Sequence, residues 1–249
     1  VKSAKSSFET WKETSKQERI KLLEKLLEIY KSRWDEMTNA ISTELGCPKD
    51  WCSANQTASG AGHIEDFIKR LKEFNFEPGF DKGSVNHIVY EPIGVCGLIT
   101  PWNWPINQVV SKLAPCLAAG CTSVLKPSEI SPLSAIIFAE LIHEAGTPAG
   151  VFNMVHGYGP VVGEAMSKHP NIDMMSFTGS TRGGISVAKA AADTVKRVSQ
   201  ELGGKSPNII LDDNCFEQSV ARGVSGCMNN TGQSCNAPTR MLVPKNRHD

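Results

Sequence analysis

Apolar residues recur every three or four positions through the first 74 residues, a spacing that predicts helices. One long helix is expected over 16–45, since Ser15 and Glu18 form a capping box before it. Gly46 and Pro48 end this pattern. Its apolar positions are Leu23, Leu26, Leu27, Tyr30, Trp34, Met37 and Ile41. Two further helices are expected over 3–14 and 54–73, and His63 on the second is interpreted as a surface or packing residue.

From residue 84 the pattern changes to short apolar strands that alternate with helices. Alternation with short loops and continuous apolar strands predicts an α/β fold, a parallel sheet covered by helices on both faces. Gly120 and Gly146 follow expected helix ends, where a left-handed residue is common. The expected strands are 84–90, 95–100, 123–126, 151–155, 174–177 and 195–200, and the expected helices are 106–119, 132–145, 160–168 and 181–193.

After Gly204 a new unit is expected, with a strand over 208–211, a helix over 216–229 and a strand over 241–243. It is interpreted as the start of a second α/β domain. The sequence opens on Val and not Met, and we expect it to be part of a longer protein. The expected domain boundaries are 1–74, 75–92, 93–204 and 205–249.

Composition excludes several classes of function. The 249 residues carry 26 basic and 26 acidic side chains, and no basic run exceeds two, so neither nucleic-acid nor anionic-membrane binding is indicated. No apolar run approaches the roughly 20 residues of a spanning helix. The eight cysteines include no C-x-x-C pair, so neither a metal cluster nor a secreted disulfide scaffold is favoured. A reducing cytoplasm is expected.

Cys235 lies in GCMNNTGQSCNAPTR, the segment 226–240, after an expected helix end and a Gly-Gln corner. Such a turn can hold a thiol beside a backbone N–H, which suits a covalent nucleophile because attack creates an oxyanion. The alternative is a buried structural cysteine, which is the usual role of a lone Cys.

The loops 100–105, 126–131, 156–160, 178–184 and 201–206 each follow an expected strand. Ligands of parallel sheets bind at the carboxyl ends of the strands, so these loops are expected to open on one side. In ITPWNWP, Asn103 offers an amide donor for an oxyanion. The alternative is an Asx-turn residue, which is the more common role of a lone Asn in such a loop.

Lys126 and Glu129 in KPSE suit the hydroxyls of an adenosine ribose, and Glu129 would repel a 2′-phosphate, which favours NAD over NADP. The alternative is a cap for the next helix by Ser128 and Glu129. Ser180, in FTGSTRGG, opens a helix whose free N–H groups could bind a pyrophosphate. GYGPVVG departs by one residue from the dinucleotide fingerprint and is a weak signal.

ELGGKS does not form a phosphate-binding P-loop, because Ser199 stands where that pattern requires Gly. Glu201 is a candidate general base for activating water. The alternatives are an ion pair with Lys205 or an interaction with a helix dipole.

Taken together and in this order, ITPWNWP, KPSE, FTGST, ELGGKSP and GQSC resemble the aldehyde dehydrogenase superfamily from about residue 90 onward. The resemblance implies a Rossmann-like domain, an NAD cofactor with NADP possible, an aldehyde substrate, and a homodimer or homotetramer. It also implies that residues 75–92 resemble part of an oligomerisation flap. The cofactor residues it implies are Ile99, Thr100, Pro101, Trp102, Lys126, Ser128, Glu129, Gly159, Gly163, Phe177, Thr178, Gly179, Ser180, Leu202 and Gly203.

The resemblance also implies roles in catalysis. Cys235 would attack the aldehyde, Asn103 and the Cys235 N–H would hold the oxyanion, and Glu201 would activate water for thioester hydrolysis. Lys112 would help to stabilise the thiolate. Substrate specificity would depend partly on helix 106–112 and on the residues beside Cys235.

Two alternatives to this function are a coenzyme A-acylating oxidoreductase, whose relatives tend to lack the base at Glu201, and a non-catalytic dinucleotide-binding protein. The Glu-x-Phe-Gly-Pro motif that clamps the nicotinamide ribose in the family is absent from these residues. This chain alone is therefore expected to be inactive.

Overall fold

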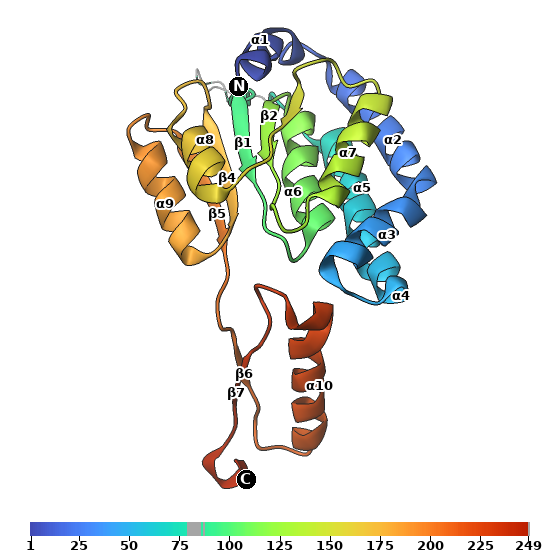
Figure 1. The fold of residues 1–249 in the computed structure, drawn as a ribbon, viewed down its shortest axis with the longest axis vertical. Helices are drawn as coiled ribbons and strands as arrows, with labels where there is room; N and C mark the ends of the chain where they lie inside the picture. Colours follow the sequence, from blue (N-terminus) through green and yellow to red (C-terminus); the bar gives the residue numbers. More distant parts are fainter. Residues whose placement is uncertain (79–85, 87, 249) are drawn as a thin grey trace.

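The computed structural model describes residues 1–78, 86 and 88–248. Its centre is a five-stranded sheet in the order β3-β2-β1-β4-β5, and every neighbouring pair is parallel (Figure 1). The predicted parallel sheet is confirmed. Because the chain moves outward from β1 in one direction and then returns to its other side, the carboxyl ends of β1 and β4 flank a crevice of the kind that binds ligands. The strands are β1 (Val95–Ile99), β2 (Thr122–Lys126), β3 (Phe152–Met154), β4 (Met174–Gly179) and β5 (Arg197–Leu202).

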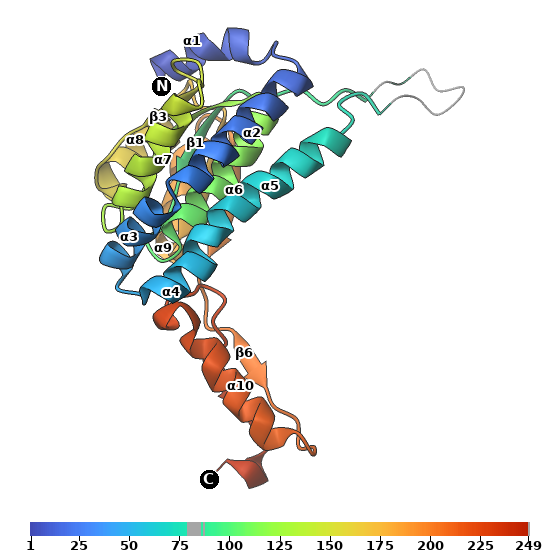
Figure 2. The same cartoon turned by 90° about the vertical axis from the view of Figure 1, so that its right-hand side faces the viewer.

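Helices cover both faces of the sheet, as the strand pattern predicts. Alternate residues of β1 point to opposite faces and so enter two different cores. Cys96 and Leu98 belong to a core formed with α2, α5, α6 and α7. Val95 and Ile99 belong to a second core that includes residues of α1, α8 and α9 (Figures 1 and 2). The helices are α1 (Lys2–Trp11), α2 (Lys16–Ser32), α3 (Trp34–Leu45), α5 (Ala58–Glu73), α6 (Pro105–Ala118), α7 (Leu133–Glu144), α8 (Glu164–Lys168) and α9 (Thr181–Ala192).

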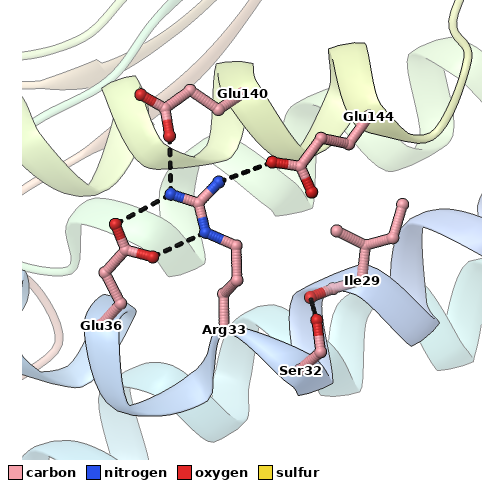
Figure 3. Close-up of polar contacts among 6 residues, drawn as sticks. All are labelled: Ile29, Ser32, Arg33, Glu36, Glu140 and Glu144. Atoms are coloured by element: carbon pink, nitrogen blue, oxygen red, sulfur yellow. Dashed lines mark hydrogen bonds and ion pairs between the residues drawn. The ribbon is translucent and has the colours of Figure 1, made fainter.

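The prediction of one helix over 16–45 is wrong, because Arg33 leaves helical geometry between α2 and α3. Its guanidinium lies 2.6 Å from Glu36 on α3 and from Glu140 on α7, and 2.9 Å from Glu144 (Figure 3). The break therefore places one cation among three carboxylates and joins the N-terminal helices to α7. The predicted capping box of Ser15 with Glu18 is confirmed.

The helix expected over 54–73 begins earlier and is less regular than predicted. It starts with α4 (Lys49–Trp51), passes through a π-helical segment, η1 (Cys52–Thr57), and continues as α5. A second π-helical segment, η2 (Gly159–Gly163), occupies most of GYGPVVG. The extra residue per turn in η1 turns Gln56 fully inward, so that its side chain is buried.

Of the strand expected over 84–90, residues 84, 85 and 87 lie outside the described part of the chain. Residues 86 and 88–90 are described and form no strand. Strand β5 begins later than expected and continues to Leu202, because its pairing with β4 extends through Thr178 opposite Glu201. No helix of the described residues has both the length and the apolar content needed to cross a membrane.

The expected strand-helix-strand unit after Gly204 is present. It consists of β6 (Pro207–Ile209), α10 (Phe216–Met228), a short 3-10 turn η3 (Asn229–Gly232) and β7 (Arg240–Leu242). Strands β6 and β7 pair in parallel, and the unit extends away from the five-stranded sheet beyond the carboxyl end of β5 (Figures 1 and 2). The turn that carries Cys235 returns from α10 toward the sheet.

Candidate active site

A cavity of about 730 Å³ lies where the loops after β1, β2, β4 and β5 meet the Cys235 turn. The predicted convergence of loops on one side of the sheet is thus confirmed, because residues from all of these loops line one space. The predicted site residues in its lining are Ile99, Thr100, Pro101, Trp102, Asn103, Lys126, Ser128, Glu129, Gly159, Phe177, Thr178, Gly179, Ser180, Gly203 and Cys235.

Cys235 is exposed at the cavity and free, so the alternative of a buried structural cysteine is wrong for this residue. A turn closed by the hydrogen bond from Ala237 N to Ser234 O, 3.1 Å long, surrounds it. Within the described residues the backbone N–H of Cys235 makes no hydrogen bond. That N–H is a free donor beside the thiol, as an oxyanion site requires.

The backbone before Cys235 is strained. Asn230 and Thr231 have φ of 54° and 55°, and Gly232 has φ of 76°. A left-handed conformation is unfavourable for a β-branched Thr and persists only where the surroundings hold it. Here the side chain of Asn230, 1% exposed, donates to the carbonyls of Asn103 at 2.8 Å and Gln233 at 3.1 Å.

Gln56 completes this network from the π-helical segment η1. Its buried amide donates to Asn230 Oδ1 at 2.7 Å and to the Asn103 carbonyl at 3.1 Å. The sequence analysis missed both residues. The Asn-Asn-Thr-Gly run could have indicated left-handed backbone at Asn230, whereas nothing local marks Gln56, whose partners lie 47 and 174 residues away.

The side chain of Asn103 bonds to the turn before Cys235 and not within its own loop. Its Nδ2 donates to the Gln233 carbonyl at 2.7 Å, so the Asx-turn alternative is not adopted. An amide nitrogen carries two hydrogens. One is fixed by Gln233, which leaves the second available to a ligand in the cavity that both residues line.

The loop after β2 forms an ion pair. Lys126, whose side chain is 3% exposed, approaches Glu129 Oε2 at 3.1 Å and also donates to the Pro127 carbonyl. Burial raises the pKa of Glu129, but hydrogen bonds from its own backbone N–H and from Lys126 outweigh this and lower it. The capping alternative is not adopted, because Ser128 accepts from Ile130 N and α7 has no side-chain cap.

Ser180 caps α9, where its Oγ accepts from Gly183 N at 3.1 Å. Ser180 and Thr181 line the cavity, so the start of α9 faces it with a positive dipole end. Two hydroxyls at the strand ends, Thr100 Oγ1 and Thr178 Oγ1, are buried without a partner among the described residues. Buried hydroxyls normally have a hydrogen-bond partner, so these two mark positions where a bound ligand would supply the missing partner.

Three predicted residues lie outside the lining of this cavity. Gly163 lines a neighbouring cavity of about 450 Å³ that shares Ile99, Gly159 and Ser180 with it. Glu201 and Leu202 are the last residues of β5, and Leu202 packs beside Gly184. Glu201 is exposed, and its carboxylate makes no hydrogen bond or ion pair in the described part of the chain, so the alternative of an ion pair with Lys205 is not adopted.

Lys112, on α6, is partly buried and donates to Ser176 Oγ on β4 at 2.9 Å. Burial lowers the pKa of Lys112 to about 8, while the negative charge of Glu201 opposes the change. The two groups are therefore close enough to interact.

Comparison with known proteins agrees with this arrangement. The sequence model of the aldehyde dehydrogenase family matches residues 1–249. This chain belongs to that family. Among its relatives, a 3-succinoylsemialdehyde-pyridine dehydrogenase from a Pseudomonas species is 51% identical over all of this chain and 52% of its own length. The resemblance stated from the motifs is confirmed.

Solved aldehyde dehydrogenases share the fold. The enzyme from Bartonella henselae is 52% identical with a TM-score of 0.94, over 98% of this chain and 52% of its own. Aldehyde dehydrogenase C of Pseudomonas syringae, solved as a cysteine-to-alanine variant with NAD+ and octanal, is 51% identical with a TM-score of 0.94, over 98% and 50%. This aldehyde dehydrogenase chain therefore spans about half the length of the relatives it matches.

Proposed function

We propose that the whole protein oxidises an aldehyde to a carboxylic acid with NAD+ as the hydride acceptor. The observation that carries the proposal is the position of Cys235, which is exposed at one cavity with a free N–H and with Asn103. Aldehyde dehydrogenase relatives solved with NAD+ support the cofactor.

The residues at the strand ends fit a dinucleotide. The unpartnered hydroxyls of Thr100 and Thr178 and the start of α9 offer donors to phosphate or ribose oxygens. Glu129 and Lys126 would hold the adenosine ribose hydroxyls, and the carboxylate of Glu129 disfavours the 2′-phosphate of NADP. Ile99, Pro101 and Trp102 would form the floor of the same space, and bound NAD+ would supply an acceptor for the substrate hydride.

Chemistry begins at Cys235. Its thiolate adds to the aldehyde carbon, and the resulting oxyanion is stabilised by the Cys235 N–H and by the free hydrogen of the Asn103 amide. Since Gln233 fixes the other hydrogen of that amide, the donor is held in place before the substrate arrives. We also propose that the positive charge of Lys112 helps to stabilise the thiolate.

Once hydride has left, Cys235 carries a thioester. Glu201 then accepts a proton from water, which attacks the thioester, releases the carboxylic acid and regenerates the thiolate. Glu201 lies outside the cavity lining in the structure. Its side chain must therefore rotate inward for this step, which is open to it because no hydrogen bond within the described residues restrains it.

Variants of three residues test the proposal in the whole protein. We expect Glu201→Gln to keep the first burst of NADH and to slow later turnovers, because acylation does not need the base. Cys235→Ser should lose both phases. Cys215→Ser is the matched control, since Cys215 is also free and exposed but lies before α10, away from the cavity. Full steady-state activity of Glu201→Gln or Cys235→Ser would overturn the assignment.

Hydrolysis by Glu201 also separates this function from coenzyme A acylation. Turnover that requires added coenzyme A would instead place the protein among the acylating oxidoreductases.

For the whole protein we also propose a homodimer or homotetramer in the cytoplasm. The free thiols, five of them buried, fit a reducing compartment.

A further inference from the structure

Helix α6 has two faces of opposite character. The face toward the core carries Ile106, Val109, Val110 and Leu113, each at most 1% exposed. The other face begins at Trp104 and continues with Asn107, Gln108 and Ser111, all partly exposed. Their spacing of three, four and seven residues places these side chains in one row along the helix. We call Asn107, Gln108 and Ser111 the polar strip.

Trp104, just before the polar strip, connects this face of α6 to the Cys235 turn. Trp104 Nε1 donates to Ser234 Oγ at 2.9 Å, which fixes the first turn of this face against the residue before Cys235. One turn further, Gln108 lines the same cavity as Asn103 and Cys235. A substrate chain that extends from Cys235 over this face therefore meets Gln108.

Hydrogen bonds within the strip fix its orientation. Asn107 Nδ2 lies 3.0 Å from His63 Nε2 on α5, and Gln108 Nε2 donates to Asn107 Oδ1 at 3.2 Å. Because an amide nitrogen can only donate, His63 Nε2 is an acceptor and the ring is neutral. Burial lowers the pKa of His63, which agrees with a neutral ring.

Gln108 is left with unused hydrogen-bonding capacity. Of its two N–H groups only one is taken, and within the described residues its Oε1 has no partner. An amide of this kind can offer both a donor and an acceptor to a ligand. An alkyl chain laid over it would remove water from these groups without replacing the hydrogen bonds, which is unfavourable.

The strip is also uncharged. Helix α6 contains no carboxylate, and its single cation, Lys112, is bonded to Ser176. A substrate with its own charge would therefore find no free counter-charge on this face. The chemistry of the strip suits a polar, neutral group.

We propose that Gln108, held by Asn107 and His63, selects aldehydes that carry an uncharged hydrogen-bonding group, such as a ketone oxygen, a few atoms from the aldehyde carbon. This inference rests on the proposed aldehyde oxidation and names its substrate class. A site built to hydrogen-bond a substrate discriminates against the analogue that lacks the group, because its own polar atoms are then left unpaired.

The test compares matched aldehydes on the whole protein with NAD+. The pairs are 4-oxopentanal with 4-methylpentanal and 5-oxohexanal with 5-methylhexanal, in which a carbonyl oxygen replaces a methyl group of similar size. We expect kcat/KM for at least one oxo-aldehyde to exceed that of its methyl partner by about tenfold. Succinic semialdehyde, which carries a carboxylate, should be poorer than the oxo-aldehydes.

Gln108→Met should reduce this preference to about twofold or less, since Met keeps the volume and loses both polar groups. Gln17→Met is the matched control, because Gln17 is exposed on α2 and the same substitution there should leave the preference intact. If Gln108→Met does not fold, as judged by its thermal unfolding, Gln108→Glu replaces it. The carboxylate lacks the N–H donors and should also remove the preference.

Equal or better oxidation of the methyl aldehydes, a preference for succinic semialdehyde, or an unchanged preference in the folded Gln108 variant would each overturn the inference. In those cases aldehyde oxidation itself would still stand, because NADH is formed. If no aldehyde yields NADH, the proposed function fails first, and the substrate class fails with it.

Discussion

Lys112 allows a prediction whose size follows from the structure. Its ammonium is largely removed from water, and burial lowers the pKa of Lys112 from 10.5 to about 8. Since each pKa unit is worth about 1.4 kcal/mol, the charged form costs the folded state about 3 kcal/mol. The side chain is partly exposed, so we expect the measured cost to be smaller, about 1–3 kcal/mol.

The sign of the pH dependence follows from proton binding. Below pH 8 Lys112 is protonated in both the folded and the unfolded state, and the full cost is present. Between pH 8 and 10.5 only the unfolded state retains the proton, so the free energy of unfolding rises with pH. Above 10.5 both states are neutral and the cost has gone.

Lys112→Met removes the charge and keeps most of the packing. Met cannot bond Ser176 Oγ, which offsets about 1 kcal/mol of the gain. At pH 7 the variant should still be more stable than the wild type, by up to about 2 kcal/mol, and this advantage should disappear as the pH approaches 10.5. The measurement is urea unfolding of both proteins at pH 7, 8, 9 and 10.

Lys21→Met is the matched control, because Lys21 is exposed on α2 and makes no hydrogen bond or ion pair in the described part of the chain. Its difference from the wild type should not vary with pH over this range. A Lys112→Met variant that is less stable than the wild type at pH 7, or a difference that stays constant from pH 7 to 10, would refute the reasoning.

Two further predictions concern buried and half-buried networks. Gln56→Leu removes one of the two donors to the Asn103 carbonyl and leaves Asn230 Oδ1 without its bond. We therefore expect the free energy of unfolding to fall by about 1–3 kcal/mol and the NADH burst to slow about tenfold. An unchanged burst rate in stopped-flow assays would contradict this. Arg33→Met should lower the free energy of unfolding by about 1–2 kcal/mol at pH 7 and low salt. Arg33 holds the pKa of Glu36 below 4.5, so this contribution should be lost as the pH falls below that value, and thermal unfolding at pH 7 and 3 checks it.

The features that the sequence predicts correctly are those that depend on local pattern. Strand and helix periods differ, so the alternation after residue 84 is sufficient to predict a parallel sheet, and strand direction then places the loops on one side. Asn103, Lys126 and Ser180 line one cavity for that reason. Gly120 and Gly146, with φ of 80° and 83°, likewise end helices as their positions indicate.

The features missed depend on partners far away in sequence. Arg33 lies within a continuous helical period, and its carboxylates on α7 are more than 100 residues away, so nothing local marks the break. Gln56 is a polar residue in a helical stretch until the π-helical segment turns it toward Asn103. The extension of β5 through Glu201 depends on its register with β4, which no local pattern reveals.

The start of α6 positions both the Asn103 amide and the Gln108 side chain, and a substitution can alter one without the other. Asn103 is fixed by Gln56, Asn230 and Gln233, and these bonds determine the position of the proposed oxyanion donor. Trp104 is fixed by Ser234, and the helix that follows carries Gln108 past the same cavity. Gln56 and Gln108 share no hydrogen-bond partner, so a change at Gln56 acts on the rate of acylation for every aldehyde. A change at Gln108 acts on the choice between aldehydes, because it alters only what the distal part of the substrate meets.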